Sequence, residues 1–371
     1  SPPTDLNASS SLTFAENQTV GTVVGEFNAT DQDAWSTLTY SLSDGHVVPS
    51  AVGLKMLWVD PGTFTMGSPT TETGRQSDRE DEHNVTLTKG FYLGKYEVTQ
   101  AQYENVMTGN PEGLSATPSQ WPNNANRPVE KVSWDDVQVF LTRLNAAEQA
   151  AGRLPSGWSY VLPTESQWEY ACRAGTTTAY SWGNTIAAAN ANYSSSGISQ
   201  TRDIGQYAAN PWGFFDMHGN VWEWVTDRYD ANYPTGNVTD PTGSASGSNR
   251  VARGGSWLSQ DTGERSARRY ADTPGFRGTA LGFRVALRYT GSASDPGKLT
   301  QNHLFTLDAN GTLKTATTFD YETVDHNYSI RVQVKDEQNA SVDQVFTVQL
   351  TNANDIPVLN QGSPSINLTA T

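Results

Sequence analysis

Two adjacent glycines, in the segment Arg253-Gly254-Gly255-Ser256-Trp257, constrain this chain more than any other feature. The pair marks a backbone turn that needs positive φ, a conformation that glycine adopts without steric cost. It is not a phosphate-binding loop, because no Lys-Ser/Thr follows it. With 32 Gly, 18 Pro and 17% charged residues, the whole chain favours short strands and many turns. Its 11 Trp supply a substantial core, so we expect a folded, loop-rich protein.

The net charge of −15 is concentrated at the two ends, 1–49 and 298–371, where acids outnumber bases. Such acidity indicates either a solvated surface or sites for a hard cation such as Ca²⁺, which prefers carboxylate and carbonyl oxygens. It argues against nucleic acid and anionic membranes as partners. No apolar run is long enough to span a membrane, and no signal peptide opens the chain. We therefore expect a fragment of a longer protein.

Cys172 is the single cysteine, and it lies in a segment with helical character, 168–173. One cysteine forms no internal disulfide and supplies no two-thiol active site. We predict that it is a small buried side chain.

Alternating strands occupy both ends of the chain. Residues 12–20, 22–29 and 38–42 form the first group, and 328–336 and 342–350 follow a predicted hairpin around Asn310-Gly311. With Glu16-Asn17 and the Ala-x-Asp-x-Asp loop at 29–33, these segments resemble a cadherin-type repeat split into two halves, 1–50 and 298–356. Residues 357–371 then resemble a linker or the start of a next repeat. A large insertion between the halves is tolerated, because closure entropy grows slowly with loop length.

The cadherin resemblance implies structural Ca²⁺ at both junctions of the repeat. At the C-terminal junction the matching residues are Glu16, Asp320, Glu322, Asn352, Asn354 and Asp355. At the N-terminal junction they are Asp31, Asp33 and Asp336. Neighbouring cadherin-like repeats would be the partners there.

The insertion, 55–289, carries three predicted helix starts, at Thr99, Ser133 and Thr164, each a residue type that caps helices. These segments, the entry strand near 58–68 and the segments 216–224 and 253–284 resemble the formylglycine-generating enzyme (sulfatase-modifying factor) family in order. The resemblance implies an α+β fold of the C-type-lectin kind with little regular secondary structure, inserted in an all-β Greek-key sandwich.

Family members bind a structural calcium at positions that match Asp216, Gly219, Val221 and Glu223. Asn192 and Tyr193 match part of a second calcium site, for which the segment 194–201 offers no clear Asp. Catalytic members also carry two cysteines that hold copper, and here Ser259 and Glu264 occupy those positions. Soft Cu(I) needs sulfur ligands, so we expect no copper and no catalysis of that kind.

What remains is a groove for a peptide or glycan ligand. Its predicted lining is Trp222, Ser256, Trp257, Ser259, Glu264, Arg265 and Arg268. Arginines there either bind ligand or pair internally with buried acids, and for Arg284 we favour the internal pair. Three functions stay open: a non-catalytic adhesion module on a calcium-stiffened stalk of a secreted or surface-attached bacterial protein, an enzyme that uses Glu264 as a general base, and a structural spacer.

Overall fold

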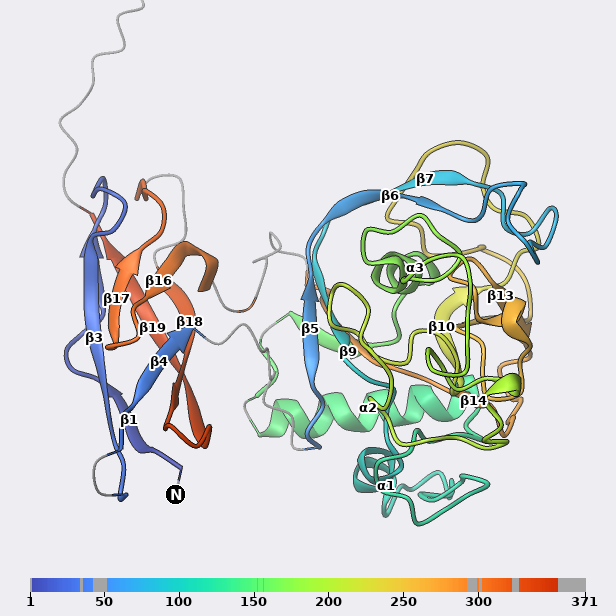
Figure 1. Ribbon diagram of the computed structural model, residues 1–371, viewed down its shortest axis with the longest axis horizontal. Coiled ribbons are helices and arrows are strands. Elements are labelled where there is room, and N and C mark those ends of the chain that lie inside the picture. The colour runs from blue at the N-terminus through green and yellow to red at the C-terminus, as the bar shows by residue number, and fades with distance from the viewer. Residues whose placement is uncertain are drawn as a thin grey trace, which may run out of the picture. The chain divides into compact units, whose positions relative to one another are not determined.

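The computed structural model divides the chain into two compact units (Figure 1). We call them the outer and the inner unit by their place along the sequence, because the first contains both ends of the chain and the second the segment between them. The outer unit combines residues 1–44 with 299–371, and the inner unit is residues 45–298. The structure describes residues 2–33, 36–42, 52–151, 153–155, 157–291, 299, 302–321 and 327–352. The predicted linker or next repeat at 357–371 lies outside these residues, as do Glu322, Asn354 and Asp355.

The outer unit consists of two four-stranded sheets with strand orders β1-β3-β17-β16 and β2-β19-β18-β4. The first contains β1 (Thr4–Ala8), β3 (Val23–Thr30), β17 (Thr312–Thr315) and β16 (Phe305–Leu307), which follows the 3-10 turn η3 (Asn302–Leu304). The second contains β2 (Thr13–Ala15), β19 (Ser341–Thr351), β18 (Asn327–Lys335) and β4 (Thr39–Leu42). Each sheet therefore combines strands from both ends of the chain, as the blue and red strands of Figure 1 show.

Both sheets contribute side chains to one core. Phe27 and Leu313 from the first sheet join Phe14, Val332 and Val348 from the second in a single buried cluster. The alternation of buried and exposed residues along β3 and β18 produces these inward faces. The predicted Asn-Gly hairpin is confirmed, with Gly311 at φ 93° between β16 and β17. The likeness to a cadherin repeat stays a prediction.

The inner unit has three small sheets. One contains β5 (Met56–Val59), β8 (Phe91–Gly94), β15 (Ala286–Tyr289) and β9 (Trp158–Val161). The second contains β11 (Val238–Thr239), β7 (His83–Leu87) and β6 (Gly62–Met66). The third contains β13 (Arg269–Asp272), β12 (Arg250–Arg253), β10 (Trp222–Arg228) and β14 (Leu281–Gly282). Short strands joined by many turns match the composition.

The three predicted helix starts are confirmed. Thr99, Ser133 and Thr164 each accept a bond from the backbone N–H three residues on, and complete capping boxes at α1 (Gln100–Met107), α2 (Trp134–Ala150) and α3 (Glu165–Arg173). Two 3-10 turns, η1 (Ser194–Ser196) and η2 (Asp261–Glu264), complete the unit. Helix α3 lies against β6, β10 and β12 and therefore positions the residues of the site described below.

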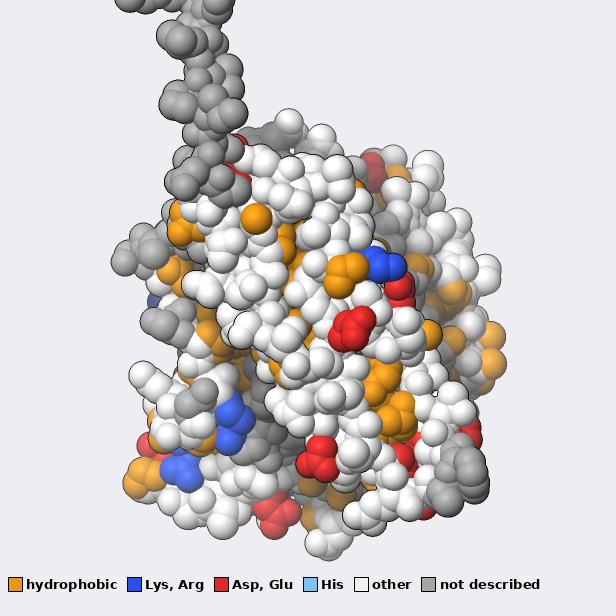
Figure 2. Space-filling view, turned by 90° about the vertical axis from the view of Figure 1, so that its left-hand side faces the viewer, with side chains coloured by type: hydrophobic (Ala, Val, Ile, Leu, Met, Phe, Trp, Pro, Cys, Tyr) orange, Lys and Arg blue, Asp and Glu red, His pale blue; other side chains and the backbone are white. Residues whose placement is uncertain are grey.

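Cys172 is fully buried in α3, as predicted, within the core of the inner unit. On the face drawn in Figure 2, charged side chains are scattered among uncharged ones and do not gather into an acidic patch. Among the helices that the structure describes, none is long and apolar enough to cross a membrane.

Candidate functional site

The Gly254-Gly255 turn has the predicted conformation, with φ of 99° and 76°. Both glycines are also required by close packing. A Cβ on Gly254 would lie 3.1 Å from the Trp168 ring, and one on Gly255 would lie 2.1 Å from Glu264 Oε2. The carboxyl group of Glu264 therefore rests directly on the backbone of the turn.

Ser259 and Glu264 stabilise this turn through hydrogen bonds to Ser256. The backbone N–H of Ser256 donates to Ser259 Oγ at 3.0 Å and to Glu264 Oε1 at 3.2 Å, and the two serine hydroxyls lie 3.2 Å apart. Glu264 is fully buried, and its Oε2 has no hydrogen-bond partner among the described residues. Burial raises the pKa of Glu264 well above its usual range and so favours the neutral carboxyl group.

Cys172 offers no substitute thiolate. Its Sγ lies 3.7 Å from the Met217 carbonyl and 3.6 Å from His218 Nε2, in a fully buried position. Burial raises the pKa of the Cys172 thiol to about 12, which keeps it protonated. Burial likewise lowers the pKa of His218 to about 4, and the neutral ring contacts the Glu264 carbonyl through Nδ1 at 2.7 Å.

Replacing Glu264 with Gln should stabilise the protein increasingly as pH rises. A raised folded-state pKa means that neutral Glu264 contributes stability below the unfolded pKa near 4.3, and that this contribution is lost as pH rises towards the folded pKa. The difference in free energy of unfolding, Glu264→Gln minus wild type, should grow by up to about 1.4 kcal/mol per pH unit above pH 5. Urea denaturation at pH 5, 6, 7 and 8 measures it. A difference that is constant across these values would contradict a neutral buried carboxyl group.

The segment 216–223 contains a tightly bonded acid cluster. Arg284 donates to both oxygens of Glu223 at 2.6 Å, and Trp168 Nε1 adds a third bond at 2.7 Å. Asp216 Oδ2 accepts from the Gly205 N–H at 2.7 Å, and burial raises the pKa of Asp216 to about 6. The predicted ligands Asp216 and Glu223 therefore have protein partners, and Arg284 is the internal pair that we favoured.

Glu97 belongs to the same cluster, although its sequence context did not predict it as a site residue. It is buried, and it accepts bonds from Asn220 Nδ2 at 2.6 Å and from the Val221 N–H at 3.1 Å. Burial and the nearby carboxylates raise the pKa of Glu97 well above its usual range. No local pattern around Glu97 marks it. Asn192 bonds to Asn220, Gln200 and Ser196, so its side chain organises this turn region.

Arg265 does not face solvent. Its guanidinium pairs with Glu72 at 2.5 Å and Glu80 at 2.8 Å, and the residue is 1% exposed. Arg265 therefore joins the segment 72–80 to η2, and it also lines a cavity there. Ligand binding by Arg265 stays a prediction. Arg268 is half-buried, and burial lowers its pKa.

Four partly exposed aromatic side chains form two pairs of neighbouring rings near the turn. The rings of Trp222 and Tyr270 are 5.3 Å apart, and those of Trp121 and Trp257 are 5.2 Å apart. One residue of each pair bonds to a neighbouring backbone carbonyl: Trp257 Nε1 donates to the carbonyl of Thr279, and the backbone N–H of Trp222 donates to the carbonyl of Ala280. We call Trp121, Trp222, Trp257 and Tyr270 the aromatic surface. The sequence identified Trp222 and Trp257, but nothing in it linked Trp121 and Tyr270 to them.

In the outer unit the structure brings Asp31, Asp33 and Asp336 together, with ligand oxygens within 4.8 Å of one another. Asp336 is buried and its Oδ1 accepts bonds from two backbone N–H groups, whereas Oδ2 has no partner among the described residues. The same holds for Asp31 Oδ2.

At the other end of this unit, Glu16 is fully buried and accepts from the Tyr321 N–H at 2.9 Å. Asp320 and Asn352 are exposed.

Comparisons with known proteins identify the class that this fold and turn define. The model of the sulfatase-modifying factor enzyme 1-like domain matches residues 46–289, and the chain belongs to that family. This confirms the family part of the resemblance. The formylglycine-generating enzyme of Mus musculus is 27% identical over 293 residues, which cover 62% of this chain and 74% of that protein. That of Streptomyces coelicolor is 33% identical over 194 residues, 47% of this chain and 56% of that one.

Solved structures give the same fold for the inner unit. PvdO from Pseudomonas aeruginosa has a TM-score of 0.56 at 26% identity and covers 64% of this chain and 95% of its own. Treponema denticola variable protein 1 has a TM-score of 0.54 at 27% identity, with coverage of 65% and 97%.

Proposed function

We propose that the inner unit is a non-catalytic binding domain of this family. The observation that carries the proposal is the role of Ser259 and Glu264, which bond the Ser256 N–H and brace the Gly-Gly turn instead of presenting thiolates. A hydroxyl and a buried carboxyl group are hard oxygen ligands, unsuited to Cu(I). Glu264 is also too deeply buried to reach a substrate as a general base.

The aromatic surface supports the binding role. Aromatic side chains with one exposed face are enriched where proteins bind peptides, and they offer large contact area at low entropic cost. Tyr270 is 37% exposed, its ring packs at a tilt against Trp222, and its hydroxyl donates to Asp272, which restricts its orientation before any ligand arrives. We infer that a peptide or glycan binds here through stacking and hydrogen bonds.

A ligand array provides the test for this surface. Labelled protein should bind a subset of immobilised peptides or glycans, and Tyr270→Ala should weaken binding at least about tenfold, the loss of roughly 1.4 kcal/mol of contact. Trp212→Ala is the matched control, because Trp212 is equally exposed at 37% but contacts Tyr170, away from the aromatic surface. Equal losses for both variants, or no binding at all, would argue for a spacer.

Catalysis needs a separate assay. Incubating the protein with Cu(I), O₂ and a cysteine-containing sulfatase peptide should leave the peptide cysteine unchanged by mass spectrometry. Conversion of that cysteine would contradict the proposal and support the alternative that the protein is an enzyme.

For the outer unit we propose structural Ca²⁺ at Asp31, Asp33 and Asp336. The buried oxygens Asp31 Oδ2 and Asp336 Oδ2 have no partners among the described residues, and ligand oxygens of the three residues lie within 4.8 Å of one another, close enough to bind one hard cation. With neighbouring repeats as partners, a calcium-stiffened unit of this kind would act as a stalk that displays the inner unit outside a bacterial cell. Extracellular location and adhesion are parts of this proposal.

A further inference from the structure

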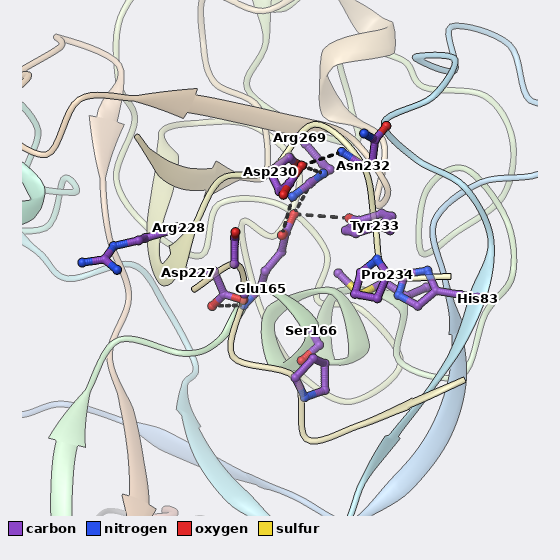
Figure 3. A pocket seen from close by; sticks show the side chains of 14 residues that line it. His83, Glu165, Ser166, Asp227, Arg228, Asp230, Asn232, Tyr233, Pro234 and Arg269 are labelled. Carbon is purple, nitrogen blue, oxygen red and sulfur yellow. Dashed lines mark hydrogen bonds and ion pairs between the residues drawn. The ribbon is translucent and has the colours of Figure 1, made fainter. Parts of the chain in front are cut away.

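A cavity of about 380 Å³ lies in the inner unit at the start of α3 (Figure 3). Its walls come from β6 and β7, from the beginning of α3, from the end of β10 and from the segment 230–244. The residues of the aromatic surface do not line it. A ligand in this cavity would therefore bind independently of the function proposed above.

The segment 230–244 is held in place over the cavity. Strand β11 within it pairs with β7 at Val238 and Val85. Gly243, at φ 82°, lies so close to Asp227 that a Cβ would come within 2.6 Å of the aspartate Cβ. This close approach helps to bury Asp227, which is 3% exposed while still lining the cavity.

The positive charge of Arg269 is already neutralised. Arg269 donates to both oxygens of Glu165, at 2.7 and 2.9 Å, as the dashed lines of Figure 3 show. Tyr233 adds a bond to Glu165 Oε1 at 3.2 Å, and its ring lies 4.1 Å from the Arg269 guanidinium. A cationic ligand would therefore not meet an unpaired arginine at this wall.

Asp227 has no comparable partner. Its Oδ2 accepts from the Glu165 N–H at 2.9 Å, but no lysine, arginine or histidine nitrogen lies within 4 Å of its carboxylate in the part of the chain that the structure describes. Arg228 also lines the cavity, and Figure 3 shows its side chain pointing away from the other labelled side chains. Burial, and secondarily the charge of Glu165, raise the pKa of Asp227 to about 7. A buried carboxylate without an ion-pair partner within 4 Å is costly, and the more distant charges of Arg269 and Arg288 offset that cost only in part, so a bound cation would offset more of it.

Another part of the cavity wall is mostly apolar. It consists of Met66, Pro234, Pro241 and the rings of His83 and Tyr233, whose centroids are 4.7 Å apart. Such a wall suits methylene groups, and long alkylammonium side chains bind by burying the stem and pairing the head.

We propose that this cavity binds an alkylammonium group, with its methylenes along the apolar wall and its ammonium against Asp227. The chemistry is that of a lysine side chain in a peptide or of a free small amine.

The first experiment uses the unmodified protein at pH 8, where Asp227 has lost its proton. Nα-acetyl-lysine methylamide, titrated by NMR, should cause saturable shifts. Its Nε-acetylated analogue, which has no charge on the side chain, should bind at least about tenfold more weakly. n-Butylamine distinguishes the sources: tighter binding of the lysine compound indicates a peptide, and equal or tighter binding of butylamine indicates a free amine. Equal affinity for the charged and acetylated compounds, or no saturable binding, would overturn the proposal.

The second experiment uses variants. Asp227→Asn should weaken binding of the lysine compound at least about tenfold. Asp230→Asn is the matched control, because Asp230 is an exposed carboxylate on the same cavity and should leave the affinity unchanged. An unchanged affinity in Asp227→Asn would place the ammonium elsewhere. If Asp227→Asn fails to fold, the comparison of charged and acetylated compounds decides alone.

Discussion

Replacing Arg284 with Met should lower the free energy of unfolding by about 3–5 kcal/mol, because it leaves the buried carboxylate of Glu223 without its counter-charge. The guanidinium is fully buried, donates twice to Glu223, and also bonds the carbonyls of Gly94 and Phe215. It thus joins β10 to β8 and to the turn before Asp216. Methionine fills part of the volume but supplies none of these donors.

Arg277→Met is the matched control for that variant. Arg277 also forms a two-bond pair, with Asp136 at 2.6 Å, but its side chain is 49% exposed. Solvent screening limits such a pair to roughly 0–1 kcal/mol. Urea denaturation of both variants at pH 7 measures the contrast. Losses of similar size at the two positions would show that burial does not set the cost, and would contradict this account of the inner unit.

Removing calcium should lower the melting temperature of the outer unit. Binding to the folded state alone adds RT ln(1 + [L]/Kd), about 2.7 kcal/mol when calcium is present at 100 times its Kd. Differential scanning calorimetry in calcium and in EDTA measures the shift. An unchanged melting temperature would contradict the metal assignments.

The variant Asp336→Asn tests whether the ion binds at this residue. The amide oxygen of Asn can still accept from the N–H groups of Gln338 and Ala340, so the turn keeps its bonds while the site loses a charge. We expect the calcium response to disappear in this variant. Asp308→Asn is the control, because Asp308 pairs with Lys314 at an exposed position and should retain the full response. A calcium response in Asp336→Asn as large as in the wild type would place the ion elsewhere.

The helix starts and the hairpin could be predicted because they depend on nearby residues. Thr99, Ser133 and Thr164 cap helices through bonds that span three residues, and Gly311 turns the chain within one hairpin. The turn at Gly254-Gly255 was predictable for the same reason, because glycine adopts positive φ without steric cost whatever its distant neighbours are.

The role of the charged side chains could not be predicted in this way. Arg265 meets Glu80 across 185 positions of sequence and Arg269 meets Glu165 across 104, and no local pattern indicates either pair. Arg265 was expected in a ligand groove, and the fold buries it between two acids.

The sequence alone determined the family, the caps and the turns. Only the tertiary structure decided that Glu264 contacts the Gly-Gly turn, that four aromatic side chains form two pairs of neighbouring rings, and that Asp227 lines a cavity without an ion-pair partner within 4 Å in the part of the chain that the structure describes. The physical reason is the separation along the sequence over which each interaction acts. Backbone preferences act over a few residues, whereas burial and charge pairing depend on segments that meet only when the chain has folded.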